Sequence, residues 1–220
     1  DLDASQESML TTNLEGTANL IKKLKKDNFR GQLHFVSSVA VAGNFCGIYT
    51  EEMFDEGQSH QHSYNKSKYL SEKHIRETQE YSCDFSIKIY RPSAIVGDTQ
   101  NGYAERVDGP YYLFQLVKKL RQSVPGWLPL TLPQSEITID MVPVDYVAKS
   151  LVALSVLPAK KSLECFHLTN PESPPIYKLV ERLLYSADGP KVIATFSTKL
   201  FEDHRSKIDF LFQINQLYVF

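Results

Sequence analysis

"QLHFVSS" (residues 32–38) is the stretch that decides the fold, because it follows Gly31 and is a short apolar run enriched in strand formers. We predict a buried strand there. A polar helix is predicted next, at about residues 62–80. The segment "FSIKIYRPSAIVG" (85–97) begins with strand-like alternation, and Pro92 then turns it into a loop. Strand, helix and strand in this order predict neighbouring parallel strands.

The same alternation continues on both sides of this unit. An amphipathic helix is predicted before it, from about residue 5 to 26, residues 98–109 are predicted to be a loop, and residues 123–136 are punctuated by prolines. Further elements follow in the order helix (111–122), strand (137–142), helix (144–157), strand (164–170), helix (176–188) and strand (191–196). We therefore predict an α/β fold with a largely parallel sheet flanked by helices.

Composition excludes several functional classes. The length of 220 residues favours one domain. The net charge of −2 gives no support for nucleic-acid binding. No apolar run is long enough for a membrane span, and no signal peptide is visible. Cys46, Cys83 and Cys165 are odd in number and far apart, which favours a reducing, cytoplasmic location. No metal site is predicted, because His60 and His62 lack further ligands at suitable spacing.

The stretch "HSYNKSKYL" (62–70) places Tyr64 and Lys68 four positions apart, hence on one helix face. An ammonium near a phenol stabilises the phenolate and lowers a pKa that is otherwise about 10, so the tyrosine could act as a general acid. A surface tyrosine and lysine is the alternative. Ser38 supports the catalytic interpretation, since it ends a strand, and ligands of open α/β sheets bind at the carboxyl ends of strands.

Some polar residues are predicted to be structural. Asp145 is expected to cap the helix that follows it, and Arg91, at a strand end, is expected to form an ion pair. His34 and His167 lie in predicted strands and are expected to be structural as well.

Four segments occur in an order typical of one family. They are "TTNLEGTANLI" (11–21), "FVSSVAVAG" (35–43), "YNKSK" (64–68) and "YRPSAIVGD" (90–98). In these segments the chain resembles the extended short-chain dehydrogenase/reductases, whose fold is Rossmann-like. The resemblance implies catalytic roles for Asn13, Ser38, Tyr64 and Lys68, with Ser38 preferred to Ser37 because it stands five residues before Gly43. It also implies cofactor-binding roles for Tyr64, Lys68, Pro92, Ser93, Ala94 and Ile95.

Further segments narrow the resemblance, which covers roughly residues 5–188. They are "RPSAIVGDTQNG" (91–102), "DGPYYLFQLVKKLRQSVPGWLPL" (108–130), "DMVPVDYVAKSL" (140–151) and "FHLTNPE" (166–172). They look like the male-sterility-type NAD-binding domain of fatty acyl-CoA and carrier-protein thioester reductases. This implies NADPH-dependent reduction of a fatty acyl thioester, bound to coenzyme A or a carrier protein, to an aldehyde or alcohol. NADP is preferred to NAD on the resemblance alone.

The resemblance also implies a domain plan. Residues 1–196 would form a partial reductase domain, with a substrate-binding subregion at about 98–136 and 158–196, and residues 197–220 stay unassigned. Further covalently linked domains are expected in the full-length protein.

One motif of the family is absent from the sequence. The ten glycines contain no Gly-x-x-Gly-x-x-Gly triplet, and the first residue is Asp1, so we interpret the chain as the C-terminal part of a reductase domain that lacks the glycine-rich βαβ unit. Two alternatives stay open. One is a nucleotide-sugar epimerase or dehydratase, although those enzymes usually carry "VYG" where residues 95–97 read "IVG". The other is a non-catalytic fragment, and the chain alone is possibly inactive.

Overall fold

The computed structural model describes residues 6–197, except 82–83, 106–108 and 135–136. The chain forms two compact units. The first comprises Asp1–Gly102 and Val142–Thr169, and the second comprises Tyr103–Met141 and Asn170–Phe220. Within the described ranges, no helix combines the length and apolarity that crossing a membrane requires. The predicted unassigned tail, residues 197–220, lies outside the described part except for Ser197.

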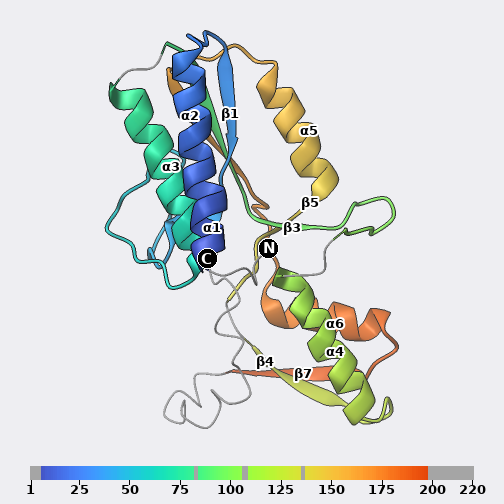
Figure 1. Cartoon of the computed structure of the whole chain (residues 1–220). Coiled ribbons are helices and arrows are strands. Elements are labelled where there is room, and N and C mark those ends of the chain that lie inside the picture. The colour runs from blue at the N-terminus through green and yellow to red at the C-terminus, as the bar shows by residue number, and fades with distance from the viewer. Residues whose placement is uncertain (1–5, 82–83, 106–108, 135–136, 198–220) are drawn as a thin grey trace. The chain divides into compact units, whose positions relative to one another are not determined.

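A parallel three-stranded sheet forms the centre of the first unit. Its strands are β1 (Gln32–Val36), β2 (Ser86–Pro92) and β6 (Leu163–Leu168), in the order β1-β2-β6 (Figure 1). Phe35 of β1 pairs with Ile89 of β2, which pairs in turn with Cys165 of β6. The predicted Rossmann-like α/β fold with parallel strands is confirmed.

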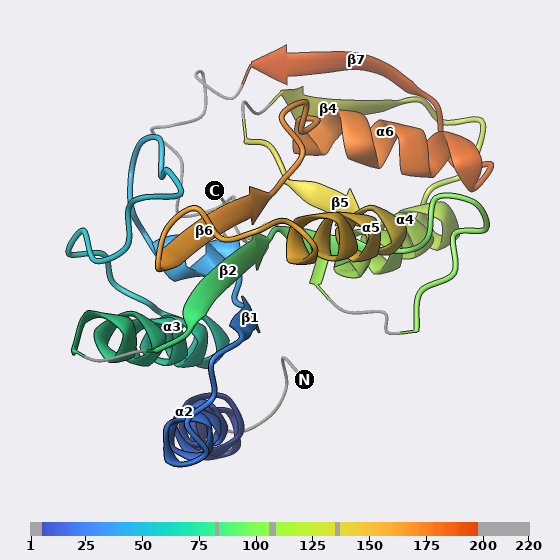
Figure 2. The same cartoon turned by 90° about the horizontal axis from the view of Figure 1, so that it is seen from above.

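Helices cover both faces of this sheet. α2 (Gly16–Lys26) and α3 (Ser63–Tyr81) lie on one face, and α5 (Val144–Ser155) lies on the other (Figures 1 and 2). Side chains of a strand alternate between the faces. Ile87 and Ile89 are therefore buried together against the α2–α3 layer, and Lys88 and Tyr90 face α5. Because both faces of β2 are covered, its polar residues Lys88 and Arg91 are buried along with its apolar ones.

The predicted helix at residues 5–26 is confirmed, with one irregularity. α1 (Gln6–Leu10) continues into a π-helical turn, η1 (Thr11–Glu15), and then into α2. Single π turns inside helices occur frequently at functional sites. This turn contains Asn13, and the periodicity of apolar residues did not predict it.

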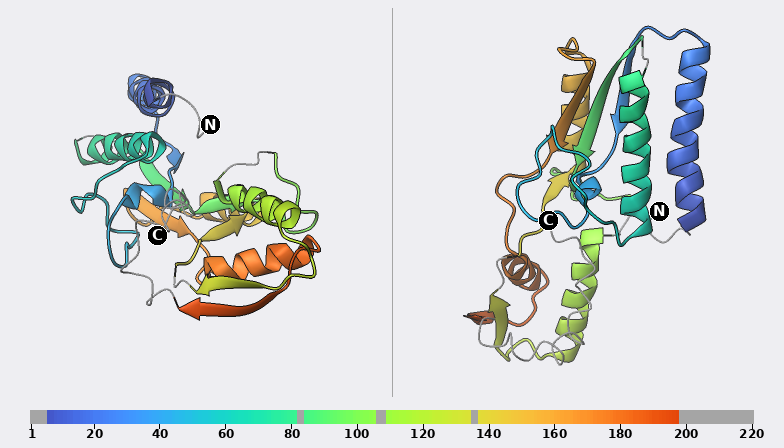
Figure 3. Two further views of the ribbon diagram at one scale, coloured as in Figure 1. Left: turned by 90° about the horizontal axis from the view of Figure 1, so that it is seen from below. Right: turned by 90° about the vertical axis from the view of Figure 1, so that its left-hand side faces the viewer.

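The second unit has its own core. α4 (Tyr112–Ser123), entered through the 3₁₀ turn η3 (Gly109–Tyr111), and α6 (Ile176–Ser186) pack against a parallel pair, β4 (Leu130–Gln134) and β7 (Val192–Ser197) (Figure 3). The buried residues of this core are Leu113, Val117, Ile139, Val180 and Leu184.

Strand β4 lies in the proline-punctuated stretch 123–136, for which no strand was predicted. Its apolar side chains, Leu130 and Leu132, alternate and pack on the core of the second unit. The partner strand β7 lies far along the chain, so the prolines around β4 were the only local signal and they did not indicate a strand.

A further difference concerns the region around residue 140. The predicted strand 137–142 is shorter and later: β5 (Met141–Pro143), whose last two residues belong to the first unit, pairs with β3 (Ala94–Val96). β6, which lies in the predicted substrate-binding range 158–196, belongs to the first unit and pairs with β2.

Lys88 of β2 anchors α5 to the sheet. Its side chain is buried, and its Nζ donates to the backbone oxygens of Leu154 (2.8 Å) and Leu157 (2.6 Å) at the end of the helix. The carbonyls of the last helical turn have no partners within the helix, and the helix dipole favours a cation there.

Replacing Lys88 with methionine is expected to lower the free energy of unfolding by about 1–3 kcal/mol, because two carbonyls at the end of α5 lose the donor that a buried side chain gives them. Chemical denaturation of the chain measures this change. Lys160→Met, at an exposed lysine beyond the same helix, is the control and should change stability by less than about 0.5 kcal/mol. Equal stability of the two variants would contradict the anchoring role.

Candidate active site

Ser38 stands just beyond the carboxyl end of β1. Its backbone is extended (φ −160°, ψ 151°), and it is the N-cap of the 3₁₀ turn Val39–Ala42. Ser38 Oγ accepts a hydrogen bond from the Ala40 amide at 3.2 Å. Among the described residues no group accepts the Ser38 hydroxyl proton, which leaves that proton available for a ligand.

Gly43 explains the five-residue spacing that pointed to Ser38. Its φ is +55°, a region that residues with a side chain rarely adopt, and a Cβ there would collide with the backbone oxygen of Ser59. The chain therefore turns sharply after the 3₁₀ turn, and the spacing follows from the close backbone approach.

Tyr64 and Lys68 both lie in α3, as predicted, with Tyr64 in its first turn. Lys68 Nζ donates to the backbone oxygen of Val36, the last residue of β1, at 3.3 Å. Burial lowers the pKa of Lys68 below its usual value. The contact holds this face of the helix at the end of the strand that leads into Ser38.

Asn13 is joined to the same helix. Its side-chain amide donates to Ser67 Oγ at 2.9 Å, and Ser67 Oγ donates to the backbone oxygen of Tyr64 at 2.8 Å. Ser67 is completely buried. The structure therefore brings Asn13, Tyr64 and Lys68 together around Ser67, a residue to which the sequence assigned no role.

The predicted cofactor segment crosses the end of β2. Pro92 ends β2, Ser93 lies between the strands, and Ala94 and Ile95 begin β3. The Ser93 amide donates to the backbone oxygen of Leu168 in β6 at 3.1 Å. The Ser93 hydroxyl is buried and makes no hydrogen bond to any described residue. A buried hydroxyl without a partner is costly, so this one is suited to a ligand.

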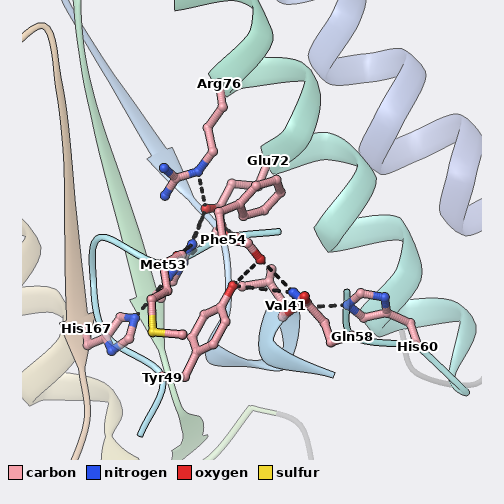
Figure 4. Close-up of polar contacts among 11 residues, drawn as sticks. Val41, Tyr49, Met53, Phe54, Gln58, His60, Glu72, Arg76 and His167 are labelled. Atoms are coloured by element: carbon pink, nitrogen blue, oxygen red, sulfur yellow. Dashed lines mark hydrogen bonds and ion pairs between the residues drawn. The ribbon is translucent and has the colours of Figure 1, made fainter. Parts of the chain in front are cut away.

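A cluster of charged side chains joins α3 to β2 (Figure 4). Glu72 of α3 and Arg91 of β2 are both completely buried, and Arg91 Nη2 donates to Glu72 Oε1 at 2.6 Å. Arg76 Nε donates to the same oxygen at 2.9 Å. Burial alone raises the pKa of Glu72, but Arg91 and Arg76 outweigh it and hold that pKa below its usual value. The predicted ion pair of Arg91 is confirmed.

Arg91 also fixes its surroundings. Its guanidinium donates to the backbone oxygen of Met53 at 3.0 Å and contacts His167 Nε2 at 3.1 Å. Burial and the neighbouring Arg91 lower the pKa of His167. His167 is therefore a structural residue, as predicted.

The loop before α3 is held by side-chain contacts (Figure 4). Gln58 Nε2 donates to the backbone oxygens of Val41 (2.9 Å) and Phe54 (2.6 Å), and His60 Nε2 lies 2.9 Å from the same Val41 oxygen. Burial raises the pKa of Tyr49 to about 12, and its hydroxyl donates to the Phe54 oxygen at 2.5 Å. These bonds connect the loop to the 3₁₀ turn after Ser38.

Asp145 differs from its predicted role. It lies inside the first turn of α5, where Pro143 is the N-cap residue, and it accepts hydrogen bonds from the amide (3.1 Å) and hydroxyl (2.9 Å) of Thr99. These bonds, with Lys149, lower the pKa of Asp145 to about 2. Asp145 therefore holds the loop that follows β3 instead of capping its own helix.

Asp145→Ala is expected to accelerate hydrogen exchange of the Thr99 amide, because that amide loses its acceptor. The folded-state pKa lies below the unfolded value, so the bond is fully present above about pH 4 and is lost as the pH falls through about 2. An NMR titration of the Thr99 amide measures the midpoint. Lys149→Ala is the control that should leave the amide protected, and a midpoint near pH 4 would contradict the assignment.

The parallel sheet flanked by helices defines a Rossmann-like domain. A family profile described as male sterility protein, of NAD-binding type, matches residues 1–151, and the chain belongs to this family. Structures of similar fold include RMD from Pseudomonas aeruginosa complexed with NADPH (TM-score 0.56, 21% identity, 86% of this chain and 61% of that one).

Individual relatives agree with this assignment. The chain is 28% identical over 165 residues to a non-reducing polyketide synthase, dbaI, of Emericella nidulans. This match covers 71% of the chain and 6% of the relative. It is similar in fold to the terminal R domain from the myxalamid PKS-NRPS biosynthetic pathway (TM-score 0.69, 24% identity, 94% of this chain and 50% of that one). It is also similar to dTDP-glucose 4,6-dehydratase from Bacillus anthracis in complex with NAD (TM-score 0.60, 17% identity, 88% and 58%). The chain thus spans a small part of the polyketide synthase and about half of the matched terminal R domain.

Proposed function

We propose that this chain carries the proton-transfer residues of a reductase that uses NADPH to convert an acyl thioester into an aldehyde or an alcohol. The contact between Lys68 and the end of β1 carries this proposal, because it holds Tyr64, Lys68 and Ser38 at one strand end. The matches to a polyketide synthase and to a terminal R domain of a PKS-NRPS pathway favour an acyl thioester as the substrate.

The residues have distinct roles in this mechanism. The Ser38 hydroxyl, whose proton has no acceptor among the described residues, polarises the thioester carbonyl. Tyr64 gives a proton to the carbonyl oxygen, and Lys68 stabilises the phenolate that remains. This proton and the hydride added to the carbonyl carbon give a hemithioacetal. The hemithioacetal then collapses: the carbon–sulfur bond breaks, the thiol leaves with a proton, and an aldehyde is released. Asn13 fixes α3 through its hydrogen bond to Ser67 and would hold a water molecule of the proton relay.

The residues present fit the nicotinamide end of a dinucleotide. Lys68 is a half-buried cation, and the Ser93 hydroxyl is buried without a partner among the described residues. These two residues, with Tyr64 and the segment Pro92–Ile95, would hold the cofactor. NADPH, when bound, supplies the hydride that the carbonyl carbon receives. We propose NADP in preference to NAD because of the resemblance to thioester reductases.

The setting of the domain is part of the same proposal. Because the polyketide synthase is many times longer than the matched segment, we propose that this chain works beside covalently linked domains, in the cytoplasm. The substrate-binding role of about residues 98–136 and 158–196 stays a prediction. The second unit, with its separate core, is where we expect most of this role.

A nucleotide-sugar epimerase or dehydratase is the second candidate. The similarity in fold to dTDP-glucose 4,6-dehydratase favours it, and that enzyme class would use the same Ser38, Tyr64 and Lys68. The "IVG" sequence at residues 95–97 counts against it. Substrate tests separate the two candidates, because one requires an acyl thioester and the other a sugar nucleotide.

The test uses the full-length protein that contains this chain. NADPH consumption is measured with a long-chain acyl-CoA, with the matching acyl-pantetheine thioester and with a sugar nucleotide, and the product is identified by mass spectrometry. We expect an aldehyde or alcohol from at least one thioester and no turnover of the sugar nucleotide. Turnover of the sugar nucleotide alone, or of no substrate, would refute the proposal.

A further inference from the structure

Glu72 is placed to connect the candidate catalytic groups to one another. It lies one helical turn after Lys68 and two turns after Tyr64 in α3, and its side chain is completely buried. Positions four and eight residues apart share a helix face, so Glu72 points from the same side of α3 as Tyr64 and Lys68. No step of the proposed mechanism uses its carboxylate.

The carboxylate binds the residue that precedes Ser38. Ser37 is buried, its hydroxyl donates to Glu72 Oε2 at 2.6 Å, and its amide donates to the backbone oxygen of Tyr90 at 2.7 Å. Ser37 is therefore held from both its side chain and its backbone. Ser38 follows with an extended backbone, in which consecutive side chains point in opposite directions. The direction in which Ser37 is held thus determines where Ser38 points.

The other carboxylate oxygen reaches the neighbouring strand. Arg91, which binds Glu72 Oε1, immediately precedes Pro92 and the buried hydroxyl of Ser93. One carboxylate thereby connects α3, the end of β1 and the end of β2. A catalytic group must be held to a fraction of an ångström, and partners behind it usually provide that precision.

We infer that Glu72 is a positioning residue which, through Ser37, fixes the Ser38 hydroxyl relative to Tyr64 and Lys68. This inference rests on the proposed function. Glu72 touches neither substrate nor cofactor in this scheme and acts only through its contact with Ser37. Its own replacement would leave Arg91 buried without a counter-charge, so Ser37 is the better site for a test.

The first test is a double-mutant cycle for thioester reduction in the full-length protein. Ser38→Ala is expected to lower kcat about 10²–10³-fold, the usual cost of losing one donor to a developing oxyanion. Ser37→Ala is expected to lower kcat about tenfold and leave KM for NADPH unchanged, because Ser38 is less precisely held. The double variant should be no slower than Ser38→Ala, since Ser37 acts only through Ser38. A further tenfold loss in the double variant would overturn the inference.

Ser71→Ala is the matched control. Ser71 is as buried as Ser37, and its hydroxyl donates to the Ser67 backbone oxygen at 2.8 Å and not to the Glu72 carboxylate. Ser71→Ala therefore removes one buried hydroxyl from α3, the helix that carries Tyr64 and Lys68. We expect kcat within about twofold of the wild type, and any small loss should persist unchanged in combination with Ser38→Ala. A tenfold loss in this control would overturn the inference, because burial alone would then explain Ser37→Ala.

A second readout does not depend on activity. The Val41 amide donates to the Ser38 backbone oxygen and the Ala40 amide donates to Ser38 Oγ, both at 3.2 Å. Hydrogen exchange at these two amides should be about tenfold faster in Ser37→Ala and unchanged in Ser71→Ala. Equal exchange rates in the wild type and Ser37→Ala would overturn the inference, whether or not the protein reduces a thioester. Failure to reduce any thioester would refute the proposed function instead.

Discussion

Tyr64→Phe is expected to lower kcat for thioester reduction by about 10²–10⁴-fold, the usual contribution of a positioned acid–base group. Phenylalanine keeps the ring and removes only the hydroxyl, and Lys68, Ser93 and the segment Pro92–Ile95 remain to hold the cofactor, so NADPH binding should be largely retained. The rate is measured by NADPH consumption in the full-length protein, and binding by the fluorescence of the bound nucleotide. A loss confined to kcat places the effect in the chemical step.

Tyr69→Phe is the control for this experiment. Tyr69 lies in the same helix, and its ring stacks on Phe54 with 4.9 Å between the centroids, which phenylalanine preserves. We expect this variant to keep nearly full activity. A Tyr64→Phe enzyme as active as Tyr69→Phe would remove Tyr64 from the mechanism.

Glu72→Gln is expected to cost about 3–5 kcal/mol of stability, because it removes the counter-charge of a buried arginine. The amide has nearly the same shape, so the loss reports charge and not packing. Because Arg91 and Arg76 outweigh burial and keep the folded-state pKa of Glu72 below its usual value, its ionised form stabilises the fold above about pH 4.3. That stabilisation is lost as the pH falls below this value, so the variant should also show a weaker pH dependence in acid.

Asp84→Asn is the matched control for Glu72→Gln. Asp84 forms an ion pair with Arg30 at 3.2 Å, but both side chains are largely exposed. Exposed pairs contribute about 0–1 kcal/mol, so this change of carboxylate to amide should be nearly neutral. Denaturant unfolding of both variants measures the difference. Similar small losses at the two sites would mean that the charge of the buried cluster contributes little to stability.

Local patterns predicted the elements that carry the candidate site. The spacing of Tyr64 and Lys68 is a property of one helix, and a strand before Ser38 follows from a run of seven residues, so both could be predicted from short windows. The predicted burial of that strand was wrong, because β1 (Gln32–Val36) is partly exposed. Asn13 was identified through the family resemblance, but the π turn that contains it has no periodic signal. Its contact with Ser67 depends on the packing of two helices.

Contacts between distant segments could not be predicted in this way. An ion pair was expected for Arg91, but its partner could have been any of the 26 acidic residues. A glutamate four residues after Lys68 on the same helix face was the one available signal for Glu72. β4 was missed for a similar reason, because its partner strand β7 comes much later in the chain.

The two buried cations of β2 have a consequence for the order of folding. The bond between Glu72 and Arg91 closes 19 residues of chain, whereas Lys88 reaches Leu154 across 66 residues. Shorter loops cost less entropy to close and form faster, which favours early docking of α3 on β2 and late docking of α5. During synthesis, we therefore expect one face of β2 to stay uncovered until α5 docks. Lys88 places a charge on that face, which discourages the aggregation to which incomplete sheets are prone.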